Sequence, residues 1–290
     1  MRVIPCRLAA VSVLLLALAV MIVATPCHAH EADSPDSISF AVFPYKSPKT
    51  IVEIYGPLAV YLEKKMGRKI RISSAPDAKS FLDKAGRGEY DLLLLALPVY
   101  YKLRPAGYKV IARGIPSFSG GVIVRKYSEI STVEQLKGKK VAVVGKYSYG
   151  GYLFLLPRLE EKGLDPREDV KFTFTGKADT IIYGVINKTF DAGLLRLDTL
   201  DHSVFNGIRE QLRVIDRSPE IPQFPFVVKN SMNAATIVAI QEALAALSPD
   251  RPEGRQILKG MQVDTIIAAT DADYDLFYEQ IKDSDYLRQP

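Results

Sequence analysis

A turn with glycines and hydroxyl groups is the part of this sequence best suited to bind a small molecule. Residues 145–152 read GKYSYGGY, between an apolar run at 141–144 and a helical pattern that ends at Gly163. Glycine lets a ligand approach the backbone, and the first N–H groups of a helix favour an anion or a strongly polar group. The pattern predicts ligand contacts from Tyr147, Ser148, Tyr149, Gly150 and Gly151. An ordinary strand–helix turn is the alternative.

Three more candidates lie near the ends of predicted strands, where open α/β sheets present their ligand-facing loops. Tyr45 ends the first strand, and Tyr100 opens a short helix after a buried strand. Tyr101 is an equal choice there, and we select Tyr100. Arg196 could hold an oxyanion with a bidentate guanidinium, or it could be a surface arginine paired with Asp198. The tyrosines also admit a cationic ligand, held by cation–π contacts, so the ligand's charge stays open.

The composition removes most enzyme classes. Both cysteines, Cys6 and Cys27, and two of the three histidines lie within the first 30 residues, which leaves only His202 beyond them. One histidine without cysteine cannot form a Cys–His or histidine-rich metal site, and no Gly-x-Ser-x-Gly motif is present. The net charge is +5, with both signs interspersed. We therefore expect no enzyme activity, metal or cofactor, and no binding to nucleic acid.

The N-terminus predicts export. Arg2 and Arg7 precede an apolar run at residues 8–24, and the chain becomes polar directly after Ala29. This is the pattern of a signal peptide, which we assign to residues 1–29. An uncleaved membrane anchor is the alternative, because the apolar run lies near the lower length limit for spanning a bilayer.

Strand and helix patterns alternate, which predicts an α/β fold with mostly parallel sheets. The predicted strands are residues 37–43, 69–73, 91–96, 109–112, 122–125, 141–144, 170–175, 192–195 and 226–229. The predicted helices are residues 51–66, 78–86, 99–103, 153–163, 179–187, 234–247 and 274–281. Pro57 inside the first helix predicts a kink or a later start.

Two joints divide the chain. Residues 114–121 contain three glycines, and residues 217–225 contain three prolines. A block between two joints predicts one lobe of residues 37–114 and 226–290, interrupted by a second lobe of residues 116–216. Two consecutive domains with a tail are the alternative. The cleft between two lobes that are joined by two crossings is the expected ligand site.

Six short segments carry a resemblance to a known family. They are residues 55–63 (YGPLAVYLE), 88–91 (GEYD), 97–101 (LPVYY), 131–139 (STVEQLKGK), 190–193 (FDAG) and 271–274 (DADY). In order and spacing they resemble the periplasmic substrate-binding proteins of phosphate, phosphite and phosphonate ABC transporters. The resemblance spans nearly the whole chain after the leader. It implies a type 2 periplasmic-binding-protein fold, in which two α/β lobes close on a ligand.

The sequence departs from this family at the predicted ligand turn. The family typically carries a turn of the Ser-Thr-Ser-Gly kind, whereas Ser148 is here the only small hydroxyl between two tyrosines. A histidine that the family carries after the next strand is also missing. Lys177 lies in that region and could supply a positive charge instead.

These observations together predict a monomeric periplasmic protein that binds a solute without chemistry. It would capture a small polar or anionic ligand, such as a phosphonate, phosphite or phosphate, for the permease of an ABC importer in the inner membrane. The alternative is a periplasmic sensor that presents its ligand-bound form to a membrane histidine kinase.

The first testable prediction concerns the leader. Because charged, apolar and small residues follow one another up to Ala29, we expect export to remove residues 1–29. N-terminal sequencing of the exported protein should begin near His30. An intact N-terminus on a membrane-embedded product would contradict cleavage.

Overall fold

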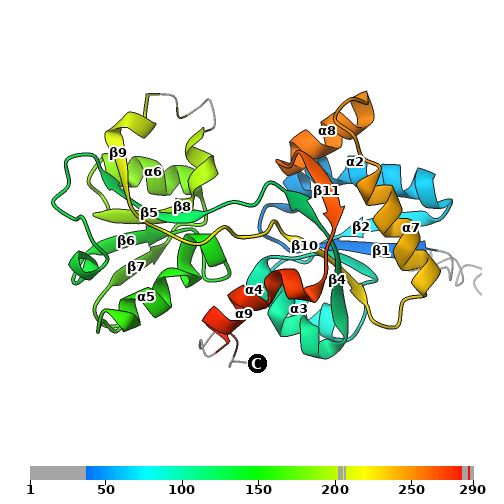
Figure 1. The fold of residues 1–290 in the computed structure, drawn as a ribbon, viewed down its shortest axis with the longest axis horizontal. Coiled ribbons are helices and arrows are strands. Elements are labelled where there is room, and N and C mark those ends of the chain that lie inside the picture. The colour runs from blue at the N-terminus through cyan, green and yellow to red at the C-terminus, as the bar shows by residue number, and fades with distance from the viewer. Residues whose placement is uncertain (1–36, 202–204, 206, 283–286, 288–290) are drawn as a thin grey trace, which may run out of the picture. The chain divides into compact units, whose positions relative to one another are not determined.

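The computed structural model describes residues 37–201, 205, 207–282 and 287 of the 290-residue chain (Figure 1). The predicted leader and His202 lie outside the described residues. Within the described part, no helix combines the length and the apolar character that crossing a membrane requires.

The first sheet has six strands in the order β11-β4-β10-β3-β1-β2. Strands β1 and β2 and strands β1 and β3 pair in parallel, whereas β10 pairs antiparallel with β3 and β4, and β11 with β4. The bounds are β1 (Ser37–Val42), β2 (Lys69–Ser73), β3 (Leu92–Leu94), β4 (Tyr108–Ile115), β10 (Pro225–Lys229) and β11 (Thr265–Ala268).

The second sheet has five strands in the order β7-β6-β8-β5-β9. Strand β6 pairs in parallel with β7 and β8, and β5 pairs antiparallel with β8 and β9. The bounds are β5 (Gly120–Arg125), β6 (Lys140–Val143), β7 (Lys171–Phe174), β8 (Ala192–Arg196) and β9 (Leu212–Arg217). The expectation of mostly parallel sheets is therefore wrong. Antiparallel pairing enters through β4, β5, β9 and β10, which directly flank the segments that connect the two sheets.

Helices cover the sheets. Their bounds are α2 (Pro48–Met66), α3 (Ala78–Gly86), α4 (Leu97–Leu103), α5 (Leu155–Glu161), α6 (Ala178–Ile186), α7 (Ala234–Ala245), α8 (Pro252–Met261) and α9 (Asp275–Ile281). The predicted helix after the ligand turn is divided: a π-helical turn at Tyr149–Leu153 precedes α5. Strands β9 and β11 and helix α8 escaped the sequence analysis, because each is short or has a polar sequence.

Alternate residues of β1 enter different cores, as the pleat of a strand requires. Phe40 and Val42 pack with the buried residues of α2, α7 and α8, whereas Ala41 packs on the side of α3 and α4. Helix α2 begins at Pro48 and runs through Pro57, so the later start predicted as one effect of Pro57 is wrong. The Ser47 side chain caps it by accepting a hydrogen bond from the N–H of Thr50 at 3.2 Å. Its buried face includes Tyr55, which enters the candidate site below.

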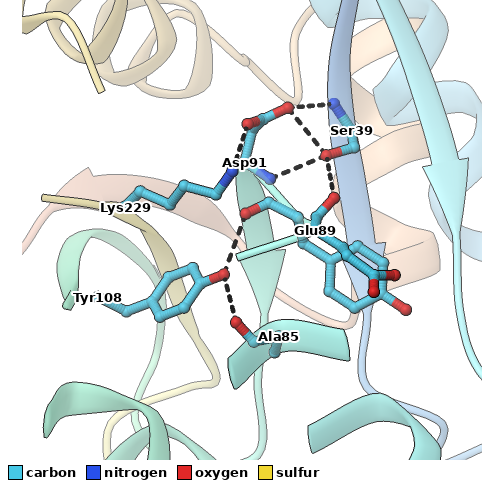
Figure 2. Close-up of polar contacts among 7 residues, drawn as sticks. Ser39, Ala85, Glu89, Asp91, Tyr108 and Lys229 are labelled. Atoms are coloured by element: carbon cyan, nitrogen blue, oxygen red, sulfur yellow. Dashed lines mark hydrogen bonds and ion pairs between the residues drawn. The ribbon is translucent and has the colours of Figure 1, made fainter. Parts of the chain in front are cut away.

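Asp91 joins three strands of the first sheet (Figure 2). Its Oδ2 accepts hydrogen bonds from the N–H of Ser39 at 2.9 Å and from the Ser39 hydroxyl at 2.8 Å. Its Oδ1 lies 3.1 Å from Nζ of Lys229 on β10. Burial raises the pKa of Asp91, but the hydrogen bonds from Ser39 and Lys229 outweigh burial and hold that pKa below its ordinary value of 3.8. One carboxylate thereby fixes the register of β1, β3 and β10.

Tyr108 anchors helix α3 beside the same carboxylate. Its hydroxyl lies 2.9 Å from the carbonyl oxygen of Ala85 and 3.1 Å from that of Tyr90 (Figure 2). The GEYD segment at residues 88–91 therefore holds the first sheet together, which is a structural role.

The second testable prediction is a pH dependence of stability. An aspartate with a lowered pKa stabilises the fold above its unfolded pKa, and this contribution is lost as the pH falls through the folded pKa. The free energy of unfolding should therefore decrease below about pH 4. Asp91→Asn should cost about 1–3 kcal/mol at pH 7 and should weaken that decrease. Urea unfolding between pH 7 and pH 3 measures both effects.

Asp83→Asn is the matched control, because Asp83 forms an exposed ion pair with Lys79 on α3. Exposed pairs contribute about 0–1 kcal/mol. An Asp91→Asn variant with the full acid sensitivity of the wild type would show that another group carries it.

Candidate functional site

Two crossing segments, residues 116–119 and 218–224, connect the sheets and pair with each other. The N–H of Phe118 donates to the carbonyl of Ile221 at 2.9 Å, and the N–H of Ile221 donates back to Phe118 at 2.7 Å. The Ser218 hydroxyl oxygen accepts a hydrogen bond from the N–H of Gly120 at 2.9 Å. The predicted joints thus meet in one antiparallel bridge between Phe118 and Ile221.

Gln223 links the two crossing segments to β8 of the second sheet and to Tyr274 near the C-terminus. Its residue is 7% exposed, and its Nε2 donates to the carbonyl of Pro116 at 2.9 Å. Its Oε1 lies 3.3 Å from Nη1 of Arg196 on β8. Its own carbonyl accepts a hydrogen bond from the Tyr274 hydroxyl at 2.8 Å. Gln223 therefore fixes the place where Arg196 meets the crossing segments.

Arg196 is held on three sides. Its Nε lies 3.1 Å from one oxygen of Asp198, and its Nη2 lies 2.5 Å from the other. Its guanidinium carbon lies 3.7 Å from the centre of the Phe118 ring, and Gln223 accepts from Nη1. The predicted alternative, a pairing with Asp198, is present. With this pairing, the guanidinium of Arg196 is fixed beside the crossing segments, and Arg196 is only partly exposed.

Tyr45 and Tyr55 form a hydroxyl pair near Arg196. Their oxygens are 2.7 Å apart, and the Tyr45 ring packs edge-on against Phe224 with centres 5.4 Å apart. Tyr45 is 36% exposed, whereas Tyr55 is 3% exposed. Burial raises the pKa of both phenols, most strongly for Tyr55, and the charge of Arg196 lowers both in part. Both phenols are therefore protonated at neutral pH, as an unperturbed tyrosine also is, and each can donate a hydrogen bond.

These residues form what we call the junction cluster, which brings together two of the predicted site residues, Tyr45 and Arg196, that lie far apart in the sequence. Its members are Tyr45, Tyr55, Phe118, Arg196, Gln223 and Phe224.

The predicted ligand turn lies against the same crossing segments. The Tyr147 ring meets the Phe43 ring at the end of β1, with centres 5.7 Å apart. The Ser148 hydroxyl oxygen accepts a hydrogen bond from the N–H of Gly151 at 3.0 Å. A Cβ at Gly150 would lie 3.1 Å from the Ile221 side chain and 3.2 Å from the Phe118 ring. The turn thus packs against Phe118, which is a member of the junction cluster.

The glycines of the turn have a packing role. A Cβ at Gly151 would lie 2.7 Å from Oγ of Ser148, and one at Gly120 would lie 2.1 Å from the carbonyl oxygen of Gly150. Approach of a ligand to these glycines stays a prediction.

Two predicted site residues point into the protein. Tyr149 is buried, its hydroxyl donates to Oε1 of Gln280 on α9, and its ring meets Phe277 edge-on. Tyr100 is fully buried, with its ring 6.0 Å from that of Tyr274. Burial, followed by the nearby Asp271 carboxylate, raises its pKa. Their roles in binding stay predictions.

Lys177 is exposed at the start of α6, where its carbonyl accepts a hydrogen bond from the Thr175 hydroxyl at 3.1 Å. Within the described residues, no hydrogen bond or ion pair joins Lys177 to Tyr45 or Arg196. Its role also stays a prediction. The same part of the chain contains no group of three or more His, Cys, Asp or Glu side chains that could hold a metal ion.

Sequence analysis missed four members of the junction cluster. Phe118, Gln223 and Phe224 lie in the predicted joints, which were treated only as connections. Tyr55 lies in the predicted helix of residues 51–66 and was not singled out as a site residue. The polar Gln223 between two prolines was the one signal available, because a glutamine in an extended apolar segment needs partners.

Comparisons with known proteins agree with this architecture. Residues 40–274 match the family model of the ABC transporter phosphonate periplasmic substrate-binding protein. The phosphate-import protein PhnD of Mycolicibacterium smegmatis is 26% identical over 227 residues, which cover 72% of this chain and 68% of that protein. The tetrathionate sensor histidine kinase TtrS of Salmonella typhimurium is 26% identical over 139 residues, or 46% of this chain. The chain spans 24% of that sensor's length.

Among solved structures, that of PhnD1 from Prochlorococcus marinus in complex with methylphosphonate superposes with a TM-score of 0.74. The similarity covers 86% of this chain and 98% of that one, at 17% sequence identity, and is a similarity of fold. It confirms the predicted two-lobed, type 2 periplasmic-binding-protein architecture. Because the family model spans most of the chain, this protein belongs to the periplasmic substrate-binding proteins of phosphonate ABC transporters.

Proposed function

We propose that this protein captures a small phosphonate-, phosphite- or phosphate-like oxyanion in the periplasm and delivers it to the permease of an ABC importer. Family membership supports the role in transport. The observation that supports an anionic ligand is the fixed guanidinium of Arg196 beside the Tyr45 hydroxyl. Capture would need no bond making or breaking.

The geometry of Arg196 suits an oxyanion. A guanidinium has five N–H donors, and the three contacts with Asp198 and Gln223 use three of them. Two donors remain for ligand oxygens. The negative charge of Asp198 is already paired with Arg196, so it offers little to a cation. This favours an anion over the cationic ligand that the tyrosines alone would allow.

The two sheets support the predicted lobes of residues 37–114 with 226–290 and of residues 116–216. The first sheet takes its strands from the former ranges, except that β4 ends at Ile115 and β10 begins at Pro225. The second sheet takes four of its five strands from within the latter range, and β9 ends at Arg217. In our proposal these lobes close on the ligand, and the crossing segments bend as the hinge. The bridge between Phe118 and Ile221 would couple the two segments in this motion.

A sensor role is the second candidate, supported by the similarity to part of a tetrathionate sensor kinase. Ligand-dependent stimulation of ATP hydrolysis by a reconstituted permease complex would identify the importer. Ligand-dependent autophosphorylation of a histidine kinase would identify the sensor.

The third testable prediction concerns Arg196. Arg196→Ala should lower the affinity for methylphosphonate, phosphite or phosphate roughly tenfold to a hundredfold, because a hydrogen bond to a charged group contributes about 1.5–3 kcal/mol. Calorimetric titration of folded variants measures the loss. Arg158→Ala is the matched control, since Arg158 also pairs with an aspartate, Asp216, and lies over a ring, that of Phe154. Equal affinity losses in both variants would remove Arg196 from the site.

The fourth testable prediction concerns Ser148. If the Ser148 hydroxyl donates to the ligand, Ser148→Ala should lower affinity about tenfold. The variant also loses the acceptor for the N–H of Gly151, so its stability should fall by about 0.5–2 kcal/mol. Calorimetry and urea unfolding separate the two effects. A loss of stability with wild-type affinity would give Ser148 a purely structural role.

A further inference from the structure

We propose that Tyr55, which does not reach the ligand, fixes the direction of the Tyr45 hydroxyl proton and makes Tyr45 a hydrogen-bond donor to a ligand oxygen. The inference rests on the proposed function, in that it takes Tyr45 and Arg196 to face one bound oxyanion. It adds a positioning residue to that site and defines the polarity of the ligand atom at Tyr45.

The burial of Tyr55 decides which hydroxyl donates. Tyr55 is 3% exposed and packs in the apolar cluster with Ile51 and Leu58 of the same helix. Within the described part of the chain, its hydroxyl has one hydrogen-bond partner, the hydroxyl of Tyr45 at 2.7 Å. If Tyr45 donated to Tyr55, the Tyr55 proton would be left among apolar groups, which carries a large desolvation penalty. Tyr55 therefore donates, and the Tyr45 oxygen accepts.

This arrangement leaves the Tyr45 proton for an acceptor outside the pair. The Tyr45 ring is held by Phe224, and its backbone N–H is bonded to the carbonyl of Phe43 at 2.8 Å. The ring can therefore turn little. At 36% exposure, Tyr45 is the half of the pair that can meet a ligand. The hydrogen bond from Tyr55 limits the rotation of the Tyr45 O–H group, so the Tyr45 proton is directed away from the core.

The neighbouring groups have the same polarity. Arg196 carries only donors, and the Ser148 oxygen already accepts from the N–H of Gly151, so its proton also points elsewhere. The Asp198 carboxylate beside Arg196 is already paired with it, and the donors that remain prefer oxygens that carry no proton. We therefore infer that the ligand presents an ionised oxygen, of a phosphonate or a related oxyanion, to Tyr45.

A double-mutant cycle on methylphosphonate binding at pH 8 tests the role of Tyr55. Tyr45→Phe should weaken binding about tenfold, since it removes a hydrogen bond to a charged acceptor. Tyr55→Phe should weaken binding roughly twofold to fivefold, because the freed hydroxyl can turn away. In the Tyr45→Phe background, Tyr55→Phe should have no further effect, because Tyr55 acts through Tyr45.

Tyr61→Phe is the matched control, since Tyr61 lies on the same helix and its hydroxyl donates to the carbonyl of Ala243 at 2.9 Å. It should leave affinity unchanged. Wild-type affinity in Tyr55→Phe, or an equal loss from Tyr55→Phe with and without the Tyr45 hydroxyl, would overturn the inference.

A second measurement needs no ligand. With difluorotyrosine at position 45, the ionisation of that phenol can be followed at mild pH by fluorine NMR. A donated hydrogen bond from Tyr55 stabilises the phenolate, so Tyr55→Phe should raise the pKa at position 45. An unchanged or lowered pKa would show that Tyr55 does not donate to this oxygen and would overturn the inference.

Two charged groups, Arg196 and Lys46, lie near Tyr45, and Tyr55→Phe changes neither of them. If the wild type bound none of the oxyanions, the proposed function would fail, while this measurement would still test whether Tyr55 donates to the oxygen at position 45.

Discussion

The contact between the backbones of Gly120 and Gly150 is the constraint on which the candidate site depends. A methyl group at Gly120 would lie 2.1 Å from the carbonyl oxygen of Gly150, so β5 and the turn after β6 meet without any side chain between them. Gly120 also donates its N–H to Ser218 of the second crossing segment. Gly120 is thus the point at which the predicted ligand turn, strand β5 and the second crossing segment meet. Ser148 and Phe118 take their positions from that point.

The glycines of the turn show how one sequence pattern can have two physical explanations. Close approach of a ligand and close approach of a neighbouring strand both exclude a side chain. The structure supplies the second explanation for Gly150, which packs against Gly120 and the crossing segments, whereas at Gly151 the Ser148 side chain of the same turn fills the space of a Cβ. Tyr149 shows the same ambiguity, because its hydroxyl and ring face α9 at Gln280 and Phe277. Without knowledge of long-range contacts, the sequence alone cannot distinguish residues that pack in the core from residues that line a ligand site.

The fold was predictable to a large extent because local patterns determine its elements. Alternating and helical periodicities located β1, β2 and α3 at or within one residue of their observed bounds. The strands that close the sheets antiparallel were harder, since β9 and β11 owe their pairing to neighbours distant in sequence. The site was harder still. Arg196 and Tyr45 could be selected by residue type, but Gln223 and Tyr55 matter through partners 27 and 10 residues away, and periodicity contains no such information.

The candidate donors share one feature, in that each is held in place by a neighbouring group of the protein. Tyr55 holds Tyr45, Asp198 and Phe118 hold Arg196, and Gly151 holds Ser148. Side chains that are already fixed lose little conformational freedom when a ligand binds, so more of the interaction energy remains as affinity. The Arg196–Asp198 pair follows the same logic. It neutralises most of the charge when the site is empty, while the planar guanidinium keeps its remaining donors oriented for an oxyanion.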